Sequence, residues 1–147
     1  MKKLLYFIFV IMVVSFIVTG CNVIQSSLPP NSPAGGDFYI CENLMKGFYT
    51  ALSNRNFAQA LTYCKSGGIS FKFANGLWDA SQDYPLFYAD FDIYNLHGHE
   101  YLTTNKIAIH YDESSTTMDN YGNSYNTLFY GNQLMLFEKI NGQWLLM

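Results

Sequence analysis

Two aspartates and two tyrosines alternate with apolar residues in the middle of this 147-residue chain, at Tyr88, Asp90, Asp92 and Tyr94. If this segment is a strand, a period of two places all four side chains on one face. A carboxylate there could accept a proton, with a tyrosine stabilising an oxyanion and His110 as a second proton carrier. The same alternation is also typical of the solvent face of a sheet. We favour the solvent face and keep Asp90, Asp92 and His110 as catalytic candidates.

The sequence His97-Gly98-His99-Glu100 has two interpretations. In a strand, histidines two residues apart share a face and could bind a metal ion together with Glu100 or His110. Alternatively, Leu96–His99 forms a hairpin turn in which Gly98 supplies a positive φ. We favour the turn, because the spacing fixes no third and fourth ligand, and we predict no metal site. Phosphate-binding, dinucleotide-binding and calcium-binding motifs are also absent from the sequence, so we predict no cofactor.

The N-terminus carries Lys2 and Lys3, an apolar run over Leu4–Val14, and then Val18-Thr19-Gly20-Cys21. This order resembles a bacterial lipoprotein signal peptide with its lipobox. The resemblance implies cleavage before Cys21 and diacylglycerol, with acyl chains such as palmitate, on the Cys21 thiol. The alternative is an uncleaved anchor, although the run is shorter than the roughly 20 apolar residues that span a bilayer.

A lipid on Cys21 would hold the mature chain outside the cytoplasm, at the outer leaflet of the cell membrane or, in a Gram-negative cell, at the outer membrane. The segment that follows is rich in Ser, Pro and Gly, which is typical of a flexible tether. We therefore predict three parts: a signal peptide over residues 1–20, the lipidated cysteine and tether over 21–36, and one domain over 37–147.

Loss of the signal peptide removes Lys2 and Lys3 and changes the formal net charge from −3 to −5. The remaining basic residues are scattered, which argues against nucleic acid as a partner. Aromatic residues make up 18% of the chain, with twelve Tyr and twelve Phe. Such side chains suit a small apolar or sugar-like ligand, although they are also frequent on strands.

Apolar residues after the tether recur with a helical period. Asp37 is placed to cap a first helix, and Asn56, with Gln59 three residues later, caps a second that ends at Ser66-Gly67-Gly68. The two helices form a helical hairpin whose apolar stripes need a sheet to cover. One face of the first helix collects Cys41, Leu44, Met45, Phe48 and Leu52.

Cys41 and Cys64 lie on the apolar stripes of the two predicted helices. A disulfide is permitted in an oxidising compartment. The two residues stand at different heights above the helix turn, whereas a disulfide tolerates Cα separations only up to about 7 Å. Two alternatives therefore stay open, a Cys41–Cys64 disulfide or two buried thiols.

From residue 87 onward the hydrophobic period changes to two. Asn141-Gly142 is typical of a type I′ turn, which joins the last two strands. Helices first and strands afterwards indicate an α+β domain, with the N-terminal helical hairpin packed on a curved antiparallel sheet. The predicted strands are 87–94, 106–112, 134–139 and 143–147; a polar loop is predicted over 112–123, a short first strand over Ile69–Phe73 and a short third helix over Leu77–Gln82.

Two parts of the chain resemble nuclear transport factor 2-like domains, a cystatin-like group that includes SnoaL-like proteins and ketosteroid isomerase. Residues 48–52 and 54–61 resemble the opening helix pair of these domains, and residues 136–144 resemble their closing hairpin, in which a Gly turn precedes a Trp. The resemblance implies a cone of curved sheet closed by helices, with a pocket inside. Many such domains bind ligands or partners without catalysis.

These patterns lead to two functional hypotheses. The first is a membrane-anchored, non-enzymatic module that binds a small apolar or sugar-like ligand or another envelope protein. The second is a ketosteroid-isomerase-like or dehydratase-like enzyme that uses a pocket Asp or His. Homodimerisation through the sheet face around Leu134–Phe137 is a further prediction.

Overall fold

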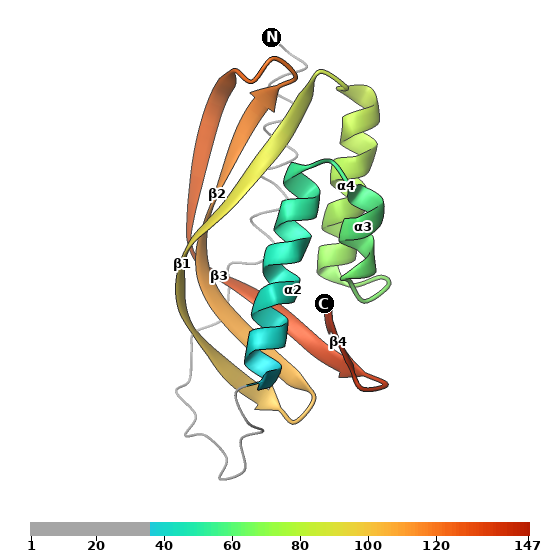
Figure 1. The fold of residues 1–147 in the computed structure, drawn as a ribbon, viewed down its shortest axis with the longest axis vertical. Helices are drawn as coiled ribbons and strands as arrows, with labels where there is room; N and C mark the ends of the chain where they lie inside the picture. The colour runs from blue at the N-terminus through green and yellow to red at the C-terminus, as the bar shows by residue number, and fades with distance from the viewer. Residues whose placement is uncertain (1–35) are drawn as a thin grey trace.

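The computed structural model of the chain describes residues 36–147. The predicted signal peptide, the lipidation of Cys21 and all but the last residue of the predicted tether lie outside the described residues. Within residues 36–147, none of the helices combines the length and the apolar character that crossing a membrane requires. The helices are α2 (Gly36–Ser53), α3 (Phe57–Thr62) and α4 (Ile69–Asp83), and the strands are β1 (Phe87–Thr103), β2 (Lys106–Asp119), β3 (Ser124–Ile140) and β4 (Gln143–Leu146) (Figure 1).

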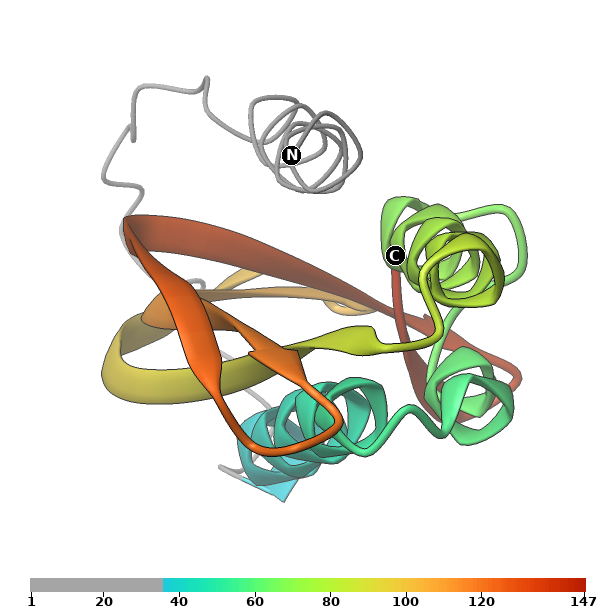
Figure 2. The ribbon, with the colours of Figure 1, turned by 90° about the horizontal axis from the view of Figure 1, so that it is seen from above.

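The four strands form one antiparallel sheet in the order of the sequence, β1-β2-β3-β4. The sheet bends around α2, and α3 and α4 stand beside it (Figure 2). This arrangement confirms the predicted α+β class, in which helices pack on a curved antiparallel sheet. The main apolar core therefore lies between the helices and the concave face of the sheet, and a small second cluster surrounds Ala89 at the start of β1.

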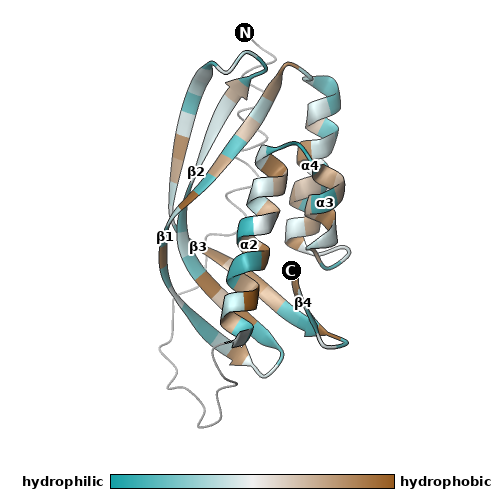
Figure 3. Ribbon diagram, in the orientation of Figure 1, coloured by the Kyte–Doolittle hydropathy of each residue, from teal (hydrophilic) through white to brown (hydrophobic). Residues whose placement is uncertain are grey.

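The core is built from the side chains that the helical period of α2 points inward. Cys41, Met45, Phe48 and Leu52 are all buried, as predicted, and Phe48 is only 1% exposed. Apolar residues alternate with hydrophilic ones along α2 and the strands (Figure 3). The sheet contributes a second set of fully buried residues, Ile107, Ile109, Phe137 and Leu146.

Two local predictions are confirmed in detail. The side chain of Asn56 accepts a hydrogen bond from the backbone N–H of Gln59 at 3.2 Å and so caps α3. The β3–β4 turn has φ of +51° at Asn141 and +84° at Gly142, as a type I′ turn requires. Short-range signals in the sequence therefore determined both features.

Residues Ile69–Phe73 form the first turns of α4, so the predicted strand is wrong, and the predicted short helix is the second half of α4. The apolar alternation in this segment is misleading because the buried face follows a helical spacing instead. The start of α4 is fixed by a distant contact, since the N–H of Ser70 donates to the carbonyl of Met147 at 2.9 Å. The buried face of α4 consists of Ser70, Ala74, Leu77 and Ser81.

The predicted polar loop over 112–123 is also wrong, because β2 continues to Asp119 and β3 begins at Ser124. Ser115 and Thr117 in this segment are buried between the two neighbouring strands. The predicted hairpin turn at Leu96–His99 is a β-bulge in the middle of β1, where Gly98 has a φ of +147° and lies opposite His110.

Asp37 lies in the first turn of α2 and has a different role from the predicted cap. Its carboxylate accepts a hydrogen bond from Trp144 Nε1 at 2.9 Å and from Lys139 Nζ at 3.2 Å. These two partners lower the pKa of Asp37, against the opposing effect of burial. The contacts join the start of α2 to the β3–β4 hairpin at the other end of the sequence.

Candidate functional site

Asp90 and Asp92 are exposed on the outer face of β1. Phe91 and Ile93 between and beside them pack into the core, so the aspartates point away from the helices. Neither carboxylate lines the hollow or the groove described below. This placement agrees with the solvent-face interpretation and gives neither aspartate the dry surroundings that a general base needs.

Each histidine contacts a residue other than Asp90 and Asp92. His110 Nε2 lies 3.4 Å from Glu100 Oε1, and His97 Nε2 lies 2.7 Å from Asp112 Oδ1. His99 stacks on Phe38, with ring centroids 3.7 Å apart. Among the described residues, no group of three or more His, Cys, Asp or Glu side chains is arranged to hold a metal ion.

Cys41 and Cys64 are both buried, and both are free thiols in the structure. Burial is the largest influence on each and raises the pKa of both thiols to about 12. Of the two alternatives that the sequence left open, the structure contains the pair of buried thiols.

The interior of the domain holds a cluster of three polar side chains that the sequence reasoning missed. Tyr49 on α2 and Tyr111 on β2 are both buried, and their hydroxyl oxygens are 2.7 Å apart, so that either can donate the hydrogen bond. Glu113, two residues further along β2, brings its carboxyl group to the same place. Its Oε2 atom is shut off from solvent and has no hydrogen-bond partner among the described residues. We call these three residues the inner cluster.

Burial dominates the electrostatics of the inner cluster. It raises the pKa of Glu113, whereas the hydroxyls of Tyr49 and Tyr111 act as donors and lower it by less. Burial also raises the pKa of both tyrosines, so that they remain neutral. The cluster therefore combines a carboxyl group whose pKa is raised by burial with two phenol groups, which is a hydrogen-bonding arrangement suited to proton transfer or to binding a polar group.

Glu113 could have been found from the sequence by continuing the alternating pattern of β2 past residue 112. Ile107, Ile109 and Tyr111 face the core, and one further step along β2 reaches Glu113 on the same face. The prediction ended this strand at residue 112 because the next residues are polar. Register shifts on both sides of β2 at this point, opposite Ile93 and opposite Tyr130, are long-range features that the sequence did not indicate.

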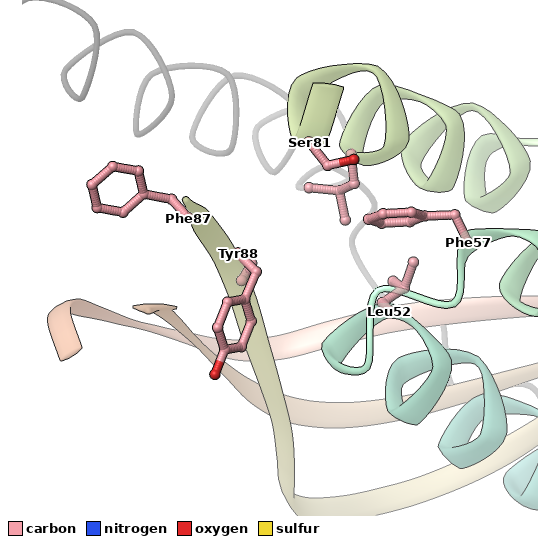
Figure 4. A pocket seen from close by; sticks show the side chains of 7 residues that line it. Leu52, Phe57, Ser81, Phe87 and Tyr88 are labelled. Atoms are coloured by element: carbon pink, nitrogen blue, oxygen red, sulfur yellow. The ribbon is translucent and has the colours of Figure 1, made fainter. Parts of the chain in front are cut away.

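Open space in the described part of the chain is limited. A small hollow lies near the start of β1, where Leu52, Phe57 and Ser81 gather around it while the ring of Phe87 points away (Figure 4). It contains about 270 Å³ including its open mouth, which is below the usual range of ligand pockets. A shallow polar groove of about 490 Å³ lies between α2 and α3. Neither of these spaces is lined by the inner cluster.

The outer face of the sheet carries two exposed aromatic rings that contact each other. Tyr94 on β1 is 52% exposed and Phe129 on β3 is 73% exposed. Their ring centroids are 6.4 Å apart at 76°, an edge-to-face arrangement. Ser114 lies opposite Phe129 on the intervening strand and is small enough for the rings to meet across β2. We call Tyr94 and Phe129 the outer aromatic pair.

No protein-family model matches the sequence, and no curated protein matches it significantly. Solved structures do resemble the fold. A nuclear transport factor 2-like protein of unknown function from Shewanella oneidensis is 13% identical, with a TM-score of 0.51 and coverage of 75% of this chain and 93% of that one. The association domain of calcium/calmodulin-dependent protein kinase II from Caenorhabditis elegans is 12% identical, with a TM-score of 0.53 and coverage of 79% and 95%.

A hexachlorocyclohexane dehydrochlorinase is also similar, at 12% identity, a TM-score of 0.50 and coverage of 75% of this chain and 80% of that one. At such low identity these similarities concern the fold alone. One of these proteins is an enzyme and another is an association domain, so the fold alone does not indicate a function. Residues 36–147 have the nuclear transport factor 2-like α+β fold, with helices packed on a curved antiparallel sheet.

Proposed function

We propose that this chain is a lipid-anchored, extracytoplasmic module that binds an envelope protein through the outer aromatic pair and does not turn over a substrate. The Val18–Cys21 pattern supports anchoring through a lipid on Cys21. The observation that carries the binding role is the exposure of Tyr94 and Phe129, side by side on the outer face. Exposed aromatic residues that contact each other are typical of the centre of protein interfaces.

The surroundings of the outer aromatic pair indicate what a partner would present. Asp90 and Asp92 are exposed on the same face of β1 as Tyr94. A partner that places an apolar or aromatic side chain on the rings and a Lys or Arg beside it would satisfy both features. The limited interior space supports binding at this surface over binding of a small ligand inside the cone.

A photo-crosslinking amino acid at position 129 tests the binding role in living cells. We expect benzoylphenylalanine in place of Phe129 to crosslink to one discrete envelope protein, and the same replacement at Tyr121, an 84% exposed residue in the β2–β3 turn, to give no such product. Changing Tyr94 to Ser should weaken the product at 129. A product that contains two copies of this chain would instead support the predicted homodimer, and absence of any protein product at 129 would contradict the proposal.

Anchoring has its own test, which does not depend on a partner. The intact mass of the chain extracted from its membrane should correspond to residues 21–147 plus a lipid modification. Cys21→Ala should release the chain from the membrane fraction. An unmodified chain that contains residues 1–20 would contradict the proposed anchoring.

The inner cluster favours a second candidate function, an enzyme that transfers a proton. Here Glu113 replaces Asp90, Asp92 and His110 as the acid–base residue, because its pKa is raised by burial and two phenols lie beside it. Native mass spectrometry of the chain taken from its own membrane provides the test. A retained small molecule that is lost in both Glu113→Gln and Tyr111→Phe would support this function, and absence of a retained molecule would argue against it.

A further inference from the structure

Three segments lie together at one end of the domain, which we call the anchored end: the first turn of α2, the β1–β2 turn and the β3–β4 turn (Figure 1). The Asp37 contacts to Trp144 and Lys139 join the first and third of these segments. The N–H of Lys139 donates to the carbonyl of Asn105 at 2.8 Å and joins the second to the third. Gly36, which leads back toward Cys21, begins this end.

The anchored end exposes three large apolar side chains. Tyr39 is 64% exposed and Ile40 is 47% exposed in the first turns of α2, and Leu102 is 48% exposed beside the β1–β2 turn. The side chains of Cys41 and Met45 occupy the core-facing side of α2, so Tyr39 and Ile40 point away from it. A tyrosine with two aliphatic residues is a composition that favours the interface between lipid headgroups and acyl chains.

Two carboxylates at the anchored end are paired with lysine, and Glu100, near the β1–β2 turn, lies beside His110. Asp37 contacts Lys139 at 3.2 Å, and Glu138 contacts Lys65 at 2.5 Å and Lys106 at 3.8 Å. These pairings leave this end close to neutral.

The opposite end of the domain carries most of the unpaired negative charge. Arg55 is the basic residue there, and its guanidinium donates to the carbonyl of Pro85 and to Asn120. The opposite end also exposes Leu86, Tyr121 and Tyr125, but the two tyrosines both donate hydrogen bonds to the carboxylate of Asp119, through the N–H of Tyr121 and the hydroxyl of Tyr125. The acidic residues in the second half of α4, the first part of β1 and the end of β2 are Asp79, Asp83, Asp90, Asp92 and Asp119.

We propose that the anchored end lies against an anionic phospholipid surface, with Tyr39, Ile40 and Leu102 entering the headgroup region. This inference rests on the proposed lipid anchor at Cys21. An acidic domain held at an anionic surface is repelled least when its negative end points away, which turns the anchored end toward the lipid. The 15 residues that follow Cys21 reach at most about 50 Å, so the tether keeps this end at a high local concentration near the surface.

An environment-sensitive fluorophore on single introduced cysteines of the lipidated mature chain, residues 21–147, tests the orientation. The sites are Ile40→Cys and Leu102→Cys at the anchored end, with Tyr121→Cys as the matched control at the opposite end. Cys41 and Cys64 are buried, and Cys21 is occupied by lipid, so the reagent labels the introduced cysteine. The labelled protein is then reconstituted in phosphatidylglycerol vesicles.

We expect the emission at positions 40 and 102 to shift to the blue on these vesicles, and the emission at 121 to stay that of a probe in water. The shift should be smaller on phosphatidylcholine vesicles, because the orienting repulsion is then absent. Water-like emission at both 40 and 102, equal shifts at 40 and 121, or equal shifts on the two lipids would each overturn the inference. The intact mass of the chain before labelling separates the two proposals, since lipidated Cys21 with water-like emission refutes only the docking.

Discussion

Replacing Glu113 with Gln tests whether burial in the interior of the domain raises the pKa of this carboxyl group. Burial raises the pKa of Glu113 above its ordinary value of 4.5 and outweighs the two phenols, which lower it. Between the ordinary pKa and the raised one, the folded chain therefore holds a proton that the unfolded chain has released. In that range of pH the free energy of unfolding falls as the pH rises.

The size of this loss of stability follows from the difference between the pKa of Glu113 in the folded and in the unfolded chain. For each unit by which the folded-state pKa exceeds 4.5, the ionised carboxylate costs about 1.4 kcal/mol of stability at pH values above both pKa values. Glutamine has nearly the same shape, carries no charge and still offers an oxygen that accepts a hydrogen bond from a tyrosine hydroxyl. We therefore expect Glu113→Gln to become progressively more stable relative to wild type as the pH rises above 4.5, until the difference levels off.

Urea unfolding of the full chain between pH 4 and 8 measures this difference, with the fluorescence of the buried Trp144 as one signal. Glu138→Gln is the matched control. The Lys65 ammonium lowers the pKa of Glu138. Wild type should therefore have a larger free energy of unfolding than Glu138→Gln at neutral pH, and this difference should disappear in acid. A difference between Glu113→Gln and wild type that does not change with pH would refute the reasoning about the inner cluster.

Further predictions concern backbone conformation, buried thiols and acid stability. Gly142→Ala should lower the free energy of unfolding by about 1 kcal/mol, because φ at this position is +84°. Gly76→Ala should raise it by about 0.5–1 kcal/mol, because Gly76 lies inside α4 with open space for the added methyl group. Urea denaturation of both variants checks these opposite effects. Cys41 and Cys64 should react with a thiol reagent in urea but not in the native protein, because burial raises the pKa of both to about 12. The hydrogen bonds from Asn123 lower the pKa of Asp119 to about 2, so wild type should lose stability as the pH falls from about 4 to 2. Circular dichroism should show a weaker loss in Asp119→Asn, and parallel acid profiles would contradict this prediction.

The first helices and the last hairpin of the domain, in chain order, could be predicted from the sequence because short-range signals determine them. Of the five apolar residues at helical spacing in α2, four are buried and Leu44 is partly buried, and the side chain of Asn56 caps α3 within a single turn. Asn141-Gly142 specifies its own turn and thereby the pairing of β3 with β4. Each of these features depends on residues within about ten positions of one another in the chain.

The middle of the domain could not be predicted because contacts between distant segments determine it. Ser115 and Thr117 have the polarity of loop residues, yet two neighbouring strands bury them in the sheet. Ile69–Phe73 alternates as a strand does, yet the segment is helical where Ser70 meets the C-terminal carbonyl of Met147. Gly98 supplies the positive φ that was predicted, but in a bulge and not in a turn. In each case local composition was outweighed by tertiary packing.

The same limit applies to the candidate sites. The exposed positions of Asp90 and Asp92 agree with the period-two pattern, since that pattern is local. The inner cluster required knowledge that β2 continues past residue 112, and that Tyr49, 62 positions before Tyr111, meets it across the core. Neither fact is contained in the spacing of polar residues around Glu113.

The proposed membrane orientation also bears on the proposed binding surface. If the anchored end faces the lipid, the long axis of the domain rises from the membrane and the sheet stands upright beside α2 (Figure 1). The outer face of the sheet, which carries the outer aromatic pair, then faces sideways. In that position Tyr94 and Phe129 can meet a partner that is held in the same membrane. If the sheet instead lay flat on the lipid, a photo-crosslinker at position 129 would react with acyl chains. Lipid adducts at 129 would thus contradict both proposals at once, whereas a protein adduct at 129 with blue-shifted emission at Ile40→Cys would require an upright domain.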